Sequence, residues 1–271
     1  MYSWQANRRF PQAEIQPIIE CNRSTLRKVN SWISDETYDE SLYGYGLPRA
    51  LRHLIDNEIG QFVTYSDALA YFGTFLNKRV SYLELGVSVG KNFLQMLNFF
   101  SGGTLIGFDI EQINPVLEAC LSPLGRQRWD TMPGSLKKEQ SSLSEYLYVV
   151  KNNHVNYLSG DIFDEGSWSK LSGKKFNIIL SDAFHSSEAI LFEQTMIEKY
   201  DLLDEDEFVL VWDDMAGAMV KAFDLIWHNL QARYNLEAGD RFTVHMGGWL
   251  GMHRYQHRAG FILKLDRGIE S

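Results

Sequence analysis

Acidic side chains and one histidine follow two apolar runs that are typical of buried strands. The fourth such run leads into Asp182 and, three residues later, His185, and the fifth ends in the adjacent pair Asp213 and Asp214. Because the carboxyl ends of parallel strands open onto one cleft, we expect these side chains to converge. Three close carboxylates repel one another unless a cation joins them, and an all-oxygen ligand set favours Mg²⁺ or Ca²⁺. His185 can serve as a general base near neutral pH.

Ordinary structural roles compete with these assignments. Asp213 and Asp214 could cap the next helix and face water. His185 could be a surface residue that only makes hydrogen bonds. The acidic run 204–207 is predicted to be a solvated turn before a strand. Three C-terminal histidines have spacings that suit no helix face and are interpreted as structural or substrate-contacting: His245, His253 and His257.

A glycine turn follows the first predicted strand, where the chain reads ELGVSVGKN from Glu84 onward. Glycines at such a turn let a ligand approach the backbone at a helix N-terminus, which is typical of nucleotide-class cofactors. A phosphate loop needs four residues between its glycines and then Lys-Ser/Thr, whereas Gly86 and Gly90 are separated by three and Lys91 precedes an asparagine. A dinucleotide fingerprint needs a glycine where this chain has Ser88. ATP, GTP and NAD are therefore disfavoured, and an NAD-dependent oxidoreductase stays as a weaker alternative.

The pattern Glu-x-Gly-x-x-x-Gly and a second strand ending in Asp109 resemble the S-adenosylmethionine site of class I methyltransferases, over residues 80–265 in order. The resemblance implies that Gly86 and Gly90 pass the amino-acid part of the cofactor and that Asp109 accepts hydrogen bonds from the ribose hydroxyls. Glu84 would orient the turn or meet the ammonium group. The implied cofactor-binding residues, which include an adenine-contacting pair after the 155–158 run, are Glu84, Gly86, Ser88, Gly90, Asp109, Asp161, Ile162 and Asp182.

A second resemblance concerns the acids and the histidine. An aspartate followed three residues later by a histidine, with an Asp-Asp pair ending the next strand, is similar to the metal-dependent O-methyltransferases of the mycinamicin and macrocin type, which modify sugar hydroxyls of macrolides. It implies Mg²⁺ held by Asp182, Asp213 and Asp214, with His185 as the catalytic base. The implied function is Mg²⁺-assisted O-methylation of a small natural product such as a sugar, polyketide or peptide. A metal-independent methyltransferase with His185 as sole base, or a non-catalytic scaffold, stays open.

The elements that must position these residues follow from the hydrophobic pattern. Short apolar runs alternate with stretches long enough for helices, which predicts parallel βαβ units. We therefore expect an α/β fold, a Rossmann-like, doubly wound and mostly parallel sheet, closed by an antiparallel C-terminal strand pair at 241–246 and 260–265. The predicted strands are 80–85, 104–108, 155–158, 176–180 and 208–212, and the predicted helices are 92–100, 116–121, 189–200 and 218–230.

Two regions depart from this alternation. Residues 1–75 carry helical patterns at 47–59 and 65–75 and are predicted to form a helical N-terminal cap. The cap is expected to pack on an S-adenosylmethionine-binding domain of residues 76–271. Residues 122–151 are rich in serine, proline and glycine and are predicted to be an insertion. Long excursions of this kind are often lids or oligomer contacts.

Composition limits the partners. The formal net charge is −9 and the sequence has no dense Lys/Arg stripe, so neither nucleic acid nor an anionic membrane is expected. No segment approaches about 18 consecutive apolar residues, so no membrane span is expected. Cys21 and Cys120 lack a CxxC spacing and are predicted to be free thiols, which fits a cytoplasmic location. The expected partner is a small-molecule hydroxyl acceptor, and a homo-oligomer stays open.

Overall fold

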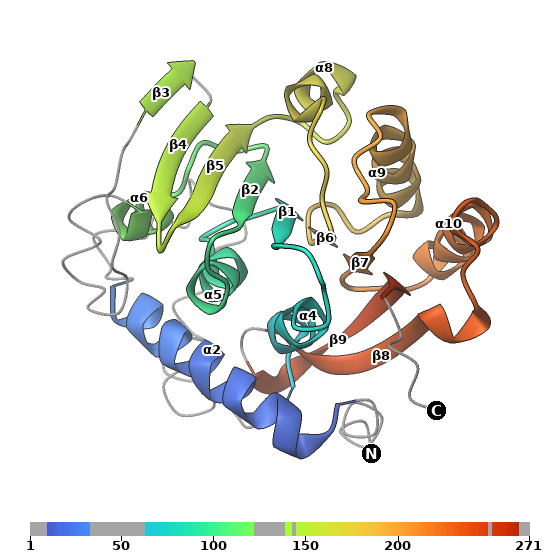
Figure 1. The fold of residues 1–271 in the computed structure, drawn as a ribbon, viewed down its shortest axis with the longest axis horizontal. Coiled ribbons are helices and arrows are strands. Elements are labelled where there is room, and N and C mark those ends of the chain that lie inside the picture. Colours follow the sequence, from blue (N-terminus) through green and yellow to red (C-terminus); the bar gives the residue numbers. More distant parts are fainter. Residues whose placement is uncertain (1–9, 33–62, 122–138, 143–144, 249–250, 266–271) are drawn as a thin grey trace.

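One β-sheet runs through the middle of the molecule (Figure 1). The computed structural model of the protein describes residues 10–32, 63–121, 139–142, 145–248 and 251–265. Within those residues the sheet has nine strands in the spatial order β3-β4-β5-β2-β1-β6-β7-β9-β8. Their bounds, in chain order, are β1 Ser81–Leu85, β2 Thr104–Asp109, β3 Glu139–Ser142, β4 Glu145–Val150, β5 Asn153–Ser159, β6 Ile178–Ser181, β7 Phe208–Trp212, β8 Arg241–Gly248 and β9 Gly251–Lys264.

The five central strands are parallel. β1 pairs with β2 on one side and with β6 on the other, and the parallel pairing continues to β5 and to β7 at the two ends. The strand order therefore reverses at β1, which is the point where open α/β sheets bind ligands. Every residue of β7 is buried, as expected for a parallel strand that is covered on both faces. These features confirm the predicted Rossmann-like, doubly wound fold.

Helices cover both faces of the sheet (Figure 1). In β1, Tyr82 packs into one hydrophobic core and Leu83 into the other, because successive strand residues point to opposite faces. The helices that contribute to the first core are α2 Gln12–Trp32, α4 Tyr65–Gly73, α5 Lys91–Phe99 and α6 Pro115–Leu121. Those that contribute to the second are α8 Glu165–Trp168, α9 Ser187–Lys199 and α10 Ala218–Tyr234, with the short 3-10 turn Ser169–Leu171. A second 3-10 turn, Ala238–Asp240, has no buried residue.

Antiparallel strands extend the sheet at both edges. β9 pairs with β7 and β8, which confirms the predicted C-terminal pair, although β9 begins at Gly251 and is longer than predicted. At the other edge β4 pairs with β5, and β3 pairs with β4. Both strands lie in the segment predicted to be an insertion. Tyr148 and Val150 alternate inward along β4, a period-2 pattern that favours a half-buried strand. The part of this segment at 122–138 lies outside the described residues.

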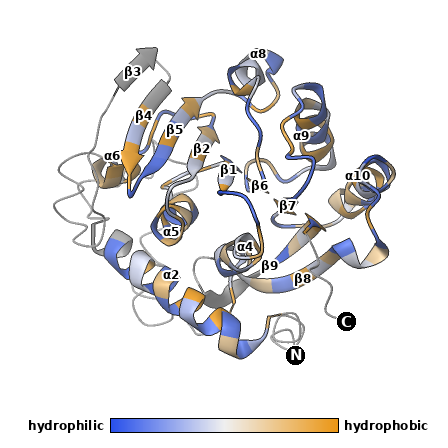
Figure 2. Cartoon of the chain, in the orientation of Figure 1, coloured by the Kyte–Doolittle hydropathy of each residue, from blue (hydrophilic) through white to orange (hydrophobic). Residues whose placement is uncertain are grey.

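The N-terminal helix α2 packs on α5 and α4. Its apolar residues Ile15, Ile18 and Ile19 recur at helical spacing and are all buried, so α2 presents one apolar side to the molecule (Figure 2). The predicted helical pattern at 47–59 lies outside the described residues. The boundary between a cap at 1–75 and a domain at 76–271 stays a prediction.

Helix α4 is fixed at its first turn. Thr64 and Asp67 form a capping box, in which each side chain accepts a hydrogen bond from the other residue's backbone N–H. Asp67 also forms a buried ion pair with Arg23 of α2, with Nη2 and Oδ2 2.6 Å apart. The pair ties α2 to the start of α4, whose first residue, Tyr65, lies in the candidate site described below.

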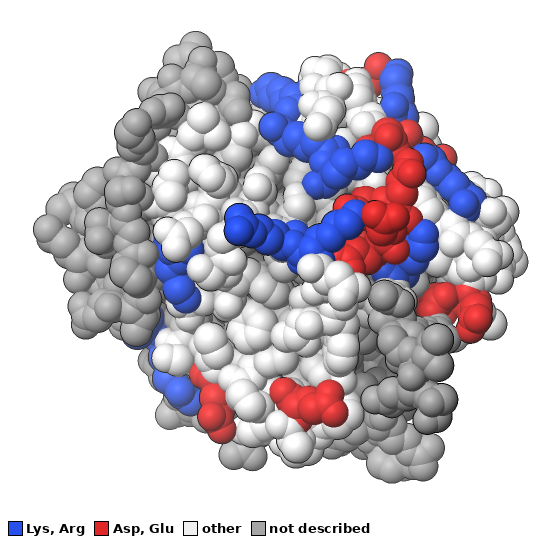
Figure 3. Space-filling model, viewed as in Figure 1, with Lys and Arg blue, Asp and Glu red and all other residues white. Residues whose placement is uncertain are grey.

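Charged side chains of both signs are mixed over the face shown in Figure 3, where basic residues lie beside acidic ones. Within the described part of the chain, none of the helices combines the length and the apolar character that crossing a membrane requires.

Candidate active site

A cavity of about 530 Å³ opens at the carboxyl ends of the central strands. Its walls come from residues at or just after the ends of β1, β2, β5, β6 and β7, together with the first residue of α4, the first two of α5 and one residue of β9. The predicted site residues that line it are Glu84, Gly86, Ser88, Asp109, Asp161, Ile162, Asp182, His185 and Asp214. Gly90 instead opens α5, and Asp213 lies fully buried behind the wall.

The two glycines of the turn lie where an added Cβ would meet neighbouring atoms. Gly86 has φ of 81°, and a Cβ placed there would lie 2.4 Å from the carbonyl oxygen of Asp182. Gly90 has φ of 78°, and a Cβ there would lie 2.9 Å from Leu117. Ser88 also has a positive φ, 50°. The turn thus brings β1 and the segment after β6 into direct backbone contact, and glycine is required at position 86 by both conformation and space.

Asp109 holds the glycine turn from the neighbouring strand. Its Oδ2 accepts hydrogen bonds from the backbone N–H groups of Val87 at 2.7 Å and Ser88 at 2.8 Å. Its Oδ1 accepts from the N–H of Glu111 at 3.0 Å. Because a carboxylate oxygen can accept more than one hydrogen bond, Asp109 can still meet a ligand's hydroxyl groups in the cavity. Its predicted contact with ribose stays a prediction.

Glu84 is a buried carboxyl at the cavity floor. Its Oε2 accepts hydrogen bonds from Tyr82 Oη at 2.6 Å and from Asn92 Nδ2 at 2.9 Å, and Ser66 Oγ donates to Asn92 Oδ1. Burial raises the pKa of Glu84 to about 8, although these hydrogen bonds act in the opposite direction. A cationic group of a ligand beside Glu84 would restore the ionised form. The position therefore suits an ammonium.

His185 and Asp182 form a pair in one turn after β6. His185 Nε2 lies 3.2 Å from Asp182 Oδ1, and Tyr65 Oη donates to Asp182 Oδ2 at 3.3 Å. His185 Nδ1 lies 3.6 Å from Asp214 Oδ2. Burial acts to lower the pKa of the His185 imidazole, but the contact with Asp182 and the charges of Asp214 and Asp213 outweigh it, so the pKa is raised. Asp182 can therefore orient the imidazole through Nε2, while Nδ1 faces Asp214.

The aspartate pair meets a histidine from β9. His257 Nδ1 lies 2.7 Å from Asp213 Oδ2 and 2.8 Å from Asp214 Oδ1. Burial raises the pKa of Asp213 to about 6 despite the imidazole, whereas His257 holds the pKa of the more exposed Asp214 below its usual value. The two carboxylates raise the pKa of His257 to about 10, against the effect of its burial. Among the described residues, these three form a group whose potential ligand atoms all lie within 4.8 Å of one another.

The predicted metal set is thus only partly assembled in one cluster. Asp182 does not belong to the group of Asp213, Asp214 and His257, and its carboxylate contacts Tyr65 and His185. The predicted coordination by Asp182 stays a prediction. The helix-cap alternative for Asp213 and Asp214 is wrong for α10, because that helix begins after Gly217 without a side-chain cap.

Sequence reasoning missed two residues of the site. His257 is one of three histidines interpreted from the sequence as structural or substrate-contacting, and Tyr65 is only part of a helical pattern. Antiparallel pairing of Trp212 with Gly260 places the residues just after β7 opposite those just before position 260. The sequence predicts the C-terminal strand pair at 241–246 and 260–265 but not this register, so it holds no signal that brings His257 to the acids. No local signal marks Tyr65, whose place depends on how α4 packs.

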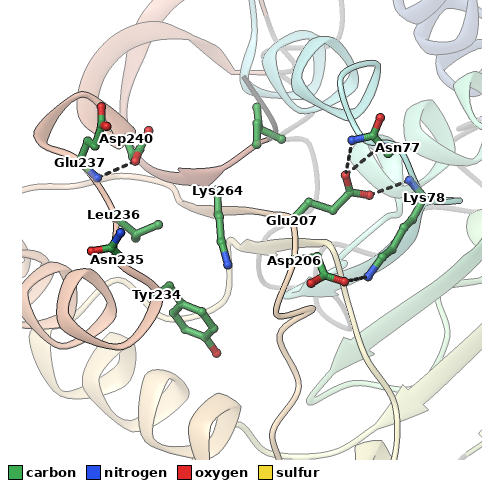
Figure 4. Close-up of a pocket in the computed structure, with 11 residues that line it drawn as sticks. Asn77, Lys78, Asp206, Glu207, Tyr234, Asn235, Leu236, Glu237, Asp240 and Lys264 are labelled. Atoms are coloured by element: carbon green, nitrogen blue, oxygen red, sulfur yellow. Dashed lines mark hydrogen bonds and ion pairs between the residues drawn. The ribbon is translucent and has the colours of Figure 1, made fainter. Parts of the chain in front are cut away.

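A second hollow, of about 470 Å³, lies near the amino end of β7, away from the cavity with the acids (Figure 4). Glu207 accepts hydrogen bonds there from the backbone N–H groups of Asn77 at 2.8 Å and Lys78 at 2.7 Å. Lys78 Nζ pairs with Asp206 at 2.6 Å and with Asp204 at 2.8 Å. The acidic run is therefore not simply solvated as predicted, because Glu207 is buried and binds the backbone that precedes β1.

Comparisons with known proteins were made at the levels of sequence and structure. No protein-family model and no curated protein matches the sequence. Among solved structures, human methyltransferase-like protein 13 in complex with SAH is similar at 13% identity and a TM-score of 0.45, covering 77% of this chain and 86% of that chain. MycE methyltransferase from the mycinamycin biosynthetic pathway, in complex with Mg and SAH, is similar at 15% identity and a TM-score of 0.40, covering 75% of this chain and 50% of that chain.

Magnesium protoporphyrin IX methyltransferase from Synechocystis PCC 6803, with bound SAM, is similar at 12% identity and a TM-score of 0.43, covering 90% of this chain and 97% of that chain. All three are methyltransferases. Identities and TM-scores in this range do not decide the function of the chain, so the assignment below rests on the geometry of its own site.

Proposed function

We propose that the chain is an S-adenosylmethionine-dependent O-methyltransferase that acts on a hydroxyl of a small natural product with the help of a divalent cation, for which the sequence favours Mg²⁺. One observation carries the proposal. A single cavity combines the acids around the glycine turn with the Asp182–His185 pair, so a cofactor and a base would face each other inside it.

The residues around the glycine turn match the chemical groups of S-adenosylmethionine. Glu84 is buried where an ammonium would offset its cost of ionisation, and Gly86 permits the close approach of the amino-acid moiety. Asp109 would accept hydrogen bonds from the ribose hydroxyls, and Asp161 from the adenine amine. Ile162, at the same wall, would supply apolar contact to the base.

His185 would move the proton. With Nε2–H donated to Asp182, the lone pair of Nδ1, which lies 3.6 Å from Asp214 Oδ2 at the wall of the cavity, would take the proton of an acceptor hydroxyl. When bound, S-adenosylmethionine would supply the methyl group, with its carbon–sulfur bond breaking as the acceptor oxygen bonds to the methyl carbon, which would leave S-adenosylhomocysteine. Asp182 orients the ring and stabilises the imidazolium, in the way that an aspartate supports a histidine base.

The acid pair suits a divalent cation. Asp213 is fully buried, and although His257 Nδ1 lies 2.7 Å from its Oδ2, neither carboxylate oxygen makes an aligned hydrogen bond in the described structure. Asp214, beside it, reaches the cavity. An ion bound there would lower the pKa of an acceptor hydroxyl. Asp213 and Asp214 would hold it, and Asp182 is the third ligand that the sequence favours.

The acceptor side of the cavity carries exposed aromatic area. Phe184 precedes His185 and is 53% exposed, and Phe163 is 44% exposed, with the two ring centroids 6.0 Å apart. Both line the cavity. Exposed apolar surface of this kind favours an acceptor with an apolar body, such as a polyketide.

A metal-independent methyltransferase is the second candidate. It is favoured by the Asp182–His185 contact, which needs neither Asp213 nor Asp214. In that case the acid pair and His257 form a structural ion-paired cluster.

Transfer of labelled methyl groups from S-adenosylmethionine to a panel of hydroxylated sugars, polyketides and peptides tests the proposal. We expect at least one acceptor to be labelled on oxygen, with loss of labelling after EDTA and recovery after Mg²⁺ is restored. Labelling that survives exhaustive chelation supports the metal-independent candidate. If the protein binds no S-adenosylmethionine, both candidates are wrong.

A further inference from the structure

The cluster of Asp213, Asp214 and His257 has separations that fit a set of metal ligands as well as an ion pair. His257 Nδ1 lies 2.7 Å from Asp213 Oδ2 and 2.8 Å from Asp214 Oδ1. A ring nitrogen carries one hydrogen and can point it along one direction, and Nδ1 makes no aligned hydrogen bond in the described structure. Neighbouring ligands around an octahedral ion with bonds of about 2.1 Å are about 3.0 Å apart, close to these separations.

The burial of Asp213 and the net charge of the cluster also favour a bound cation. Asp213 is 0% exposed, and the His257 Nδ1 that lies 2.7 Å from its Oδ2 is shared with Asp214 and makes no aligned hydrogen bond, so the burial of this carboxylate is only partly compensated. A single imidazolium leaves two carboxylates with a net charge of −1, whereas a divalent ion and a neutral imidazole balance them. Asp214 and His257 line the cavity, so an ion bound to them would have open positions toward an acceptor.

We propose that Asp213, Asp214 and His257 bind one divalent ion, and that the imidazole shifts the preference of the site from Mg²⁺ toward a first-row transition ion, for which Mn²⁺ is the probe. Mg²⁺ binds through oxygen and keeps several waters, whereas an imidazole suits the first-row transition ions, above all Fe²⁺, Ni²⁺, Cu²⁺ and Zn²⁺. Mn²⁺ also favours oxygen ligands, but as the weakest member of that transition series it accepts an imidazole more readily than Mg²⁺ does. The proposal rests on the metal-assisted form of the proposed function. It replaces Asp182 by His257 as the third ligand and leaves Asp182 to orient His185.

Binding of Mn²⁺ to the metal-free protein, without cofactor or acceptor, tests the proposal. Loss of the free-ion signal in electron paramagnetic resonance gives the Mn²⁺ affinity, and competition gives that of Mg²⁺. We expect one Mn²⁺ per chain, bound at least about tenfold more tightly than Mg²⁺. In His257→Gln the Mn²⁺ affinity should fall by about 10- to 100-fold or more, the loss known for outer-shell partners of metal ligands. The Mg²⁺ affinity should change much less.

Two control variants show whether an effect of His257→Gln is specific to the proposed site. His228 is an exposed residue of α10, remote in sequence from the site, and His228→Gln should leave both affinities unchanged. Asp213→Asn should weaken both ions. A ratio of Mn²⁺ to Mg²⁺ affinity that is unaltered in His257→Gln would overturn the proposal, as would a metal-free protein that binds neither ion.

A measurement on the unaltered protein covers the case in which a variant fails to fold. Electron spin-echo modulation of bound Mn²⁺ detects the ¹⁴N of a coordinated imidazole. We expect that coupling to be present, and its absence contradicts coordination by His257. Calorimetric titration with S-adenosylhomocysteine runs in parallel. Cofactor binding without metal binding overturns this inference alone, whereas metal binding without cofactor binding overturns the proposed function.

Discussion

Replacement of Gly86 by alanine tests the close contact between β1 and β6 at the floor of the cavity. The new Cβ would lie 2.4 Å from the Asp182 carbonyl oxygen and 2.6 Å from Ala183 Cα, so backbone rather than a flexible side chain must give way. The positive φ of 81° costs about 1 kcal/mol for a residue with a Cβ. Overpacking adds about 1 to 3 kcal/mol. We therefore expect Gly86→Ala to lower the free energy of unfolding by about 2 to 4 kcal/mol.

The same shift should reach function, because the carbonyl that must move belongs to Asp182, which holds His185. Affinity for S-adenosylhomocysteine, measured by calorimetry, should fall at least about tenfold, which corresponds to about 1.4 kcal/mol. Gly102→Ala is the matched control. Gly102 has φ of 75°, and a Cβ there meets nothing within 4 Å. The free energy of unfolding of Gly102→Ala should fall only by the cost of the positive φ, about 1 kcal/mol, and its affinity for S-adenosylhomocysteine should be unchanged. Equal stability and equal affinity in the two variants would refute the reasoning.

Three further predictions concern single side chains. Asp109→Asn should lower the affinity for S-adenosylhomocysteine at least about tenfold in calorimetry, because the ribose hydroxyls lose a charged acceptor, and unchanged affinity would remove Asp109 from cofactor binding. His185→Ala should lower kcat about 10²- to 10⁴-fold and regain activity at raised pH, whereas full activity at neutral pH excludes the role as base. Burial raises the pKa of Glu193 to about 7 from an ordinary 4.5. In this pH range the folded protein keeps the Glu193 proton that the unfolded chain releases. As pH rises from 4.5 to 7, the free energy of unfolding of the wild type, measured with denaturant, should therefore fall by about 3 kcal/mol relative to that of Glu193→Gln. A difference that does not vary with pH contradicts this.

The strands and the glycine turn could be predicted because their signals are local. Runs such as 208–212 are apolar throughout, as strands buried on both faces must be, and the glycines at 86 and 90 adopt the positive φ that such a turn needs. Asp182 and His185 are three residues apart in one turn after β6, so their contact also needs no long-range information.

What could not be predicted depends on pairing between distant segments. His257 reaches the acids only because β9 extends back to Gly251 and pairs with β7, a register that the short apolar run at 260–265 does not reveal. Glu207 looks solvated within an acidic run, yet it is buried because two backbone N–H groups before β1 need an acceptor. In both cases a tertiary contact overrides the local pattern.

Calorimetric titration of the purified protein with S-adenosylhomocysteine and, separately, with NAD tests the central claim most directly. Saturable binding of S-adenosylhomocysteine at one site per chain, with no binding of NAD, is the result that the cavity around Glu84, Gly86 and Asp109 predicts. Saturable binding of NAD with none of S-adenosylhomocysteine would contradict it and make the chain an oxidoreductase candidate.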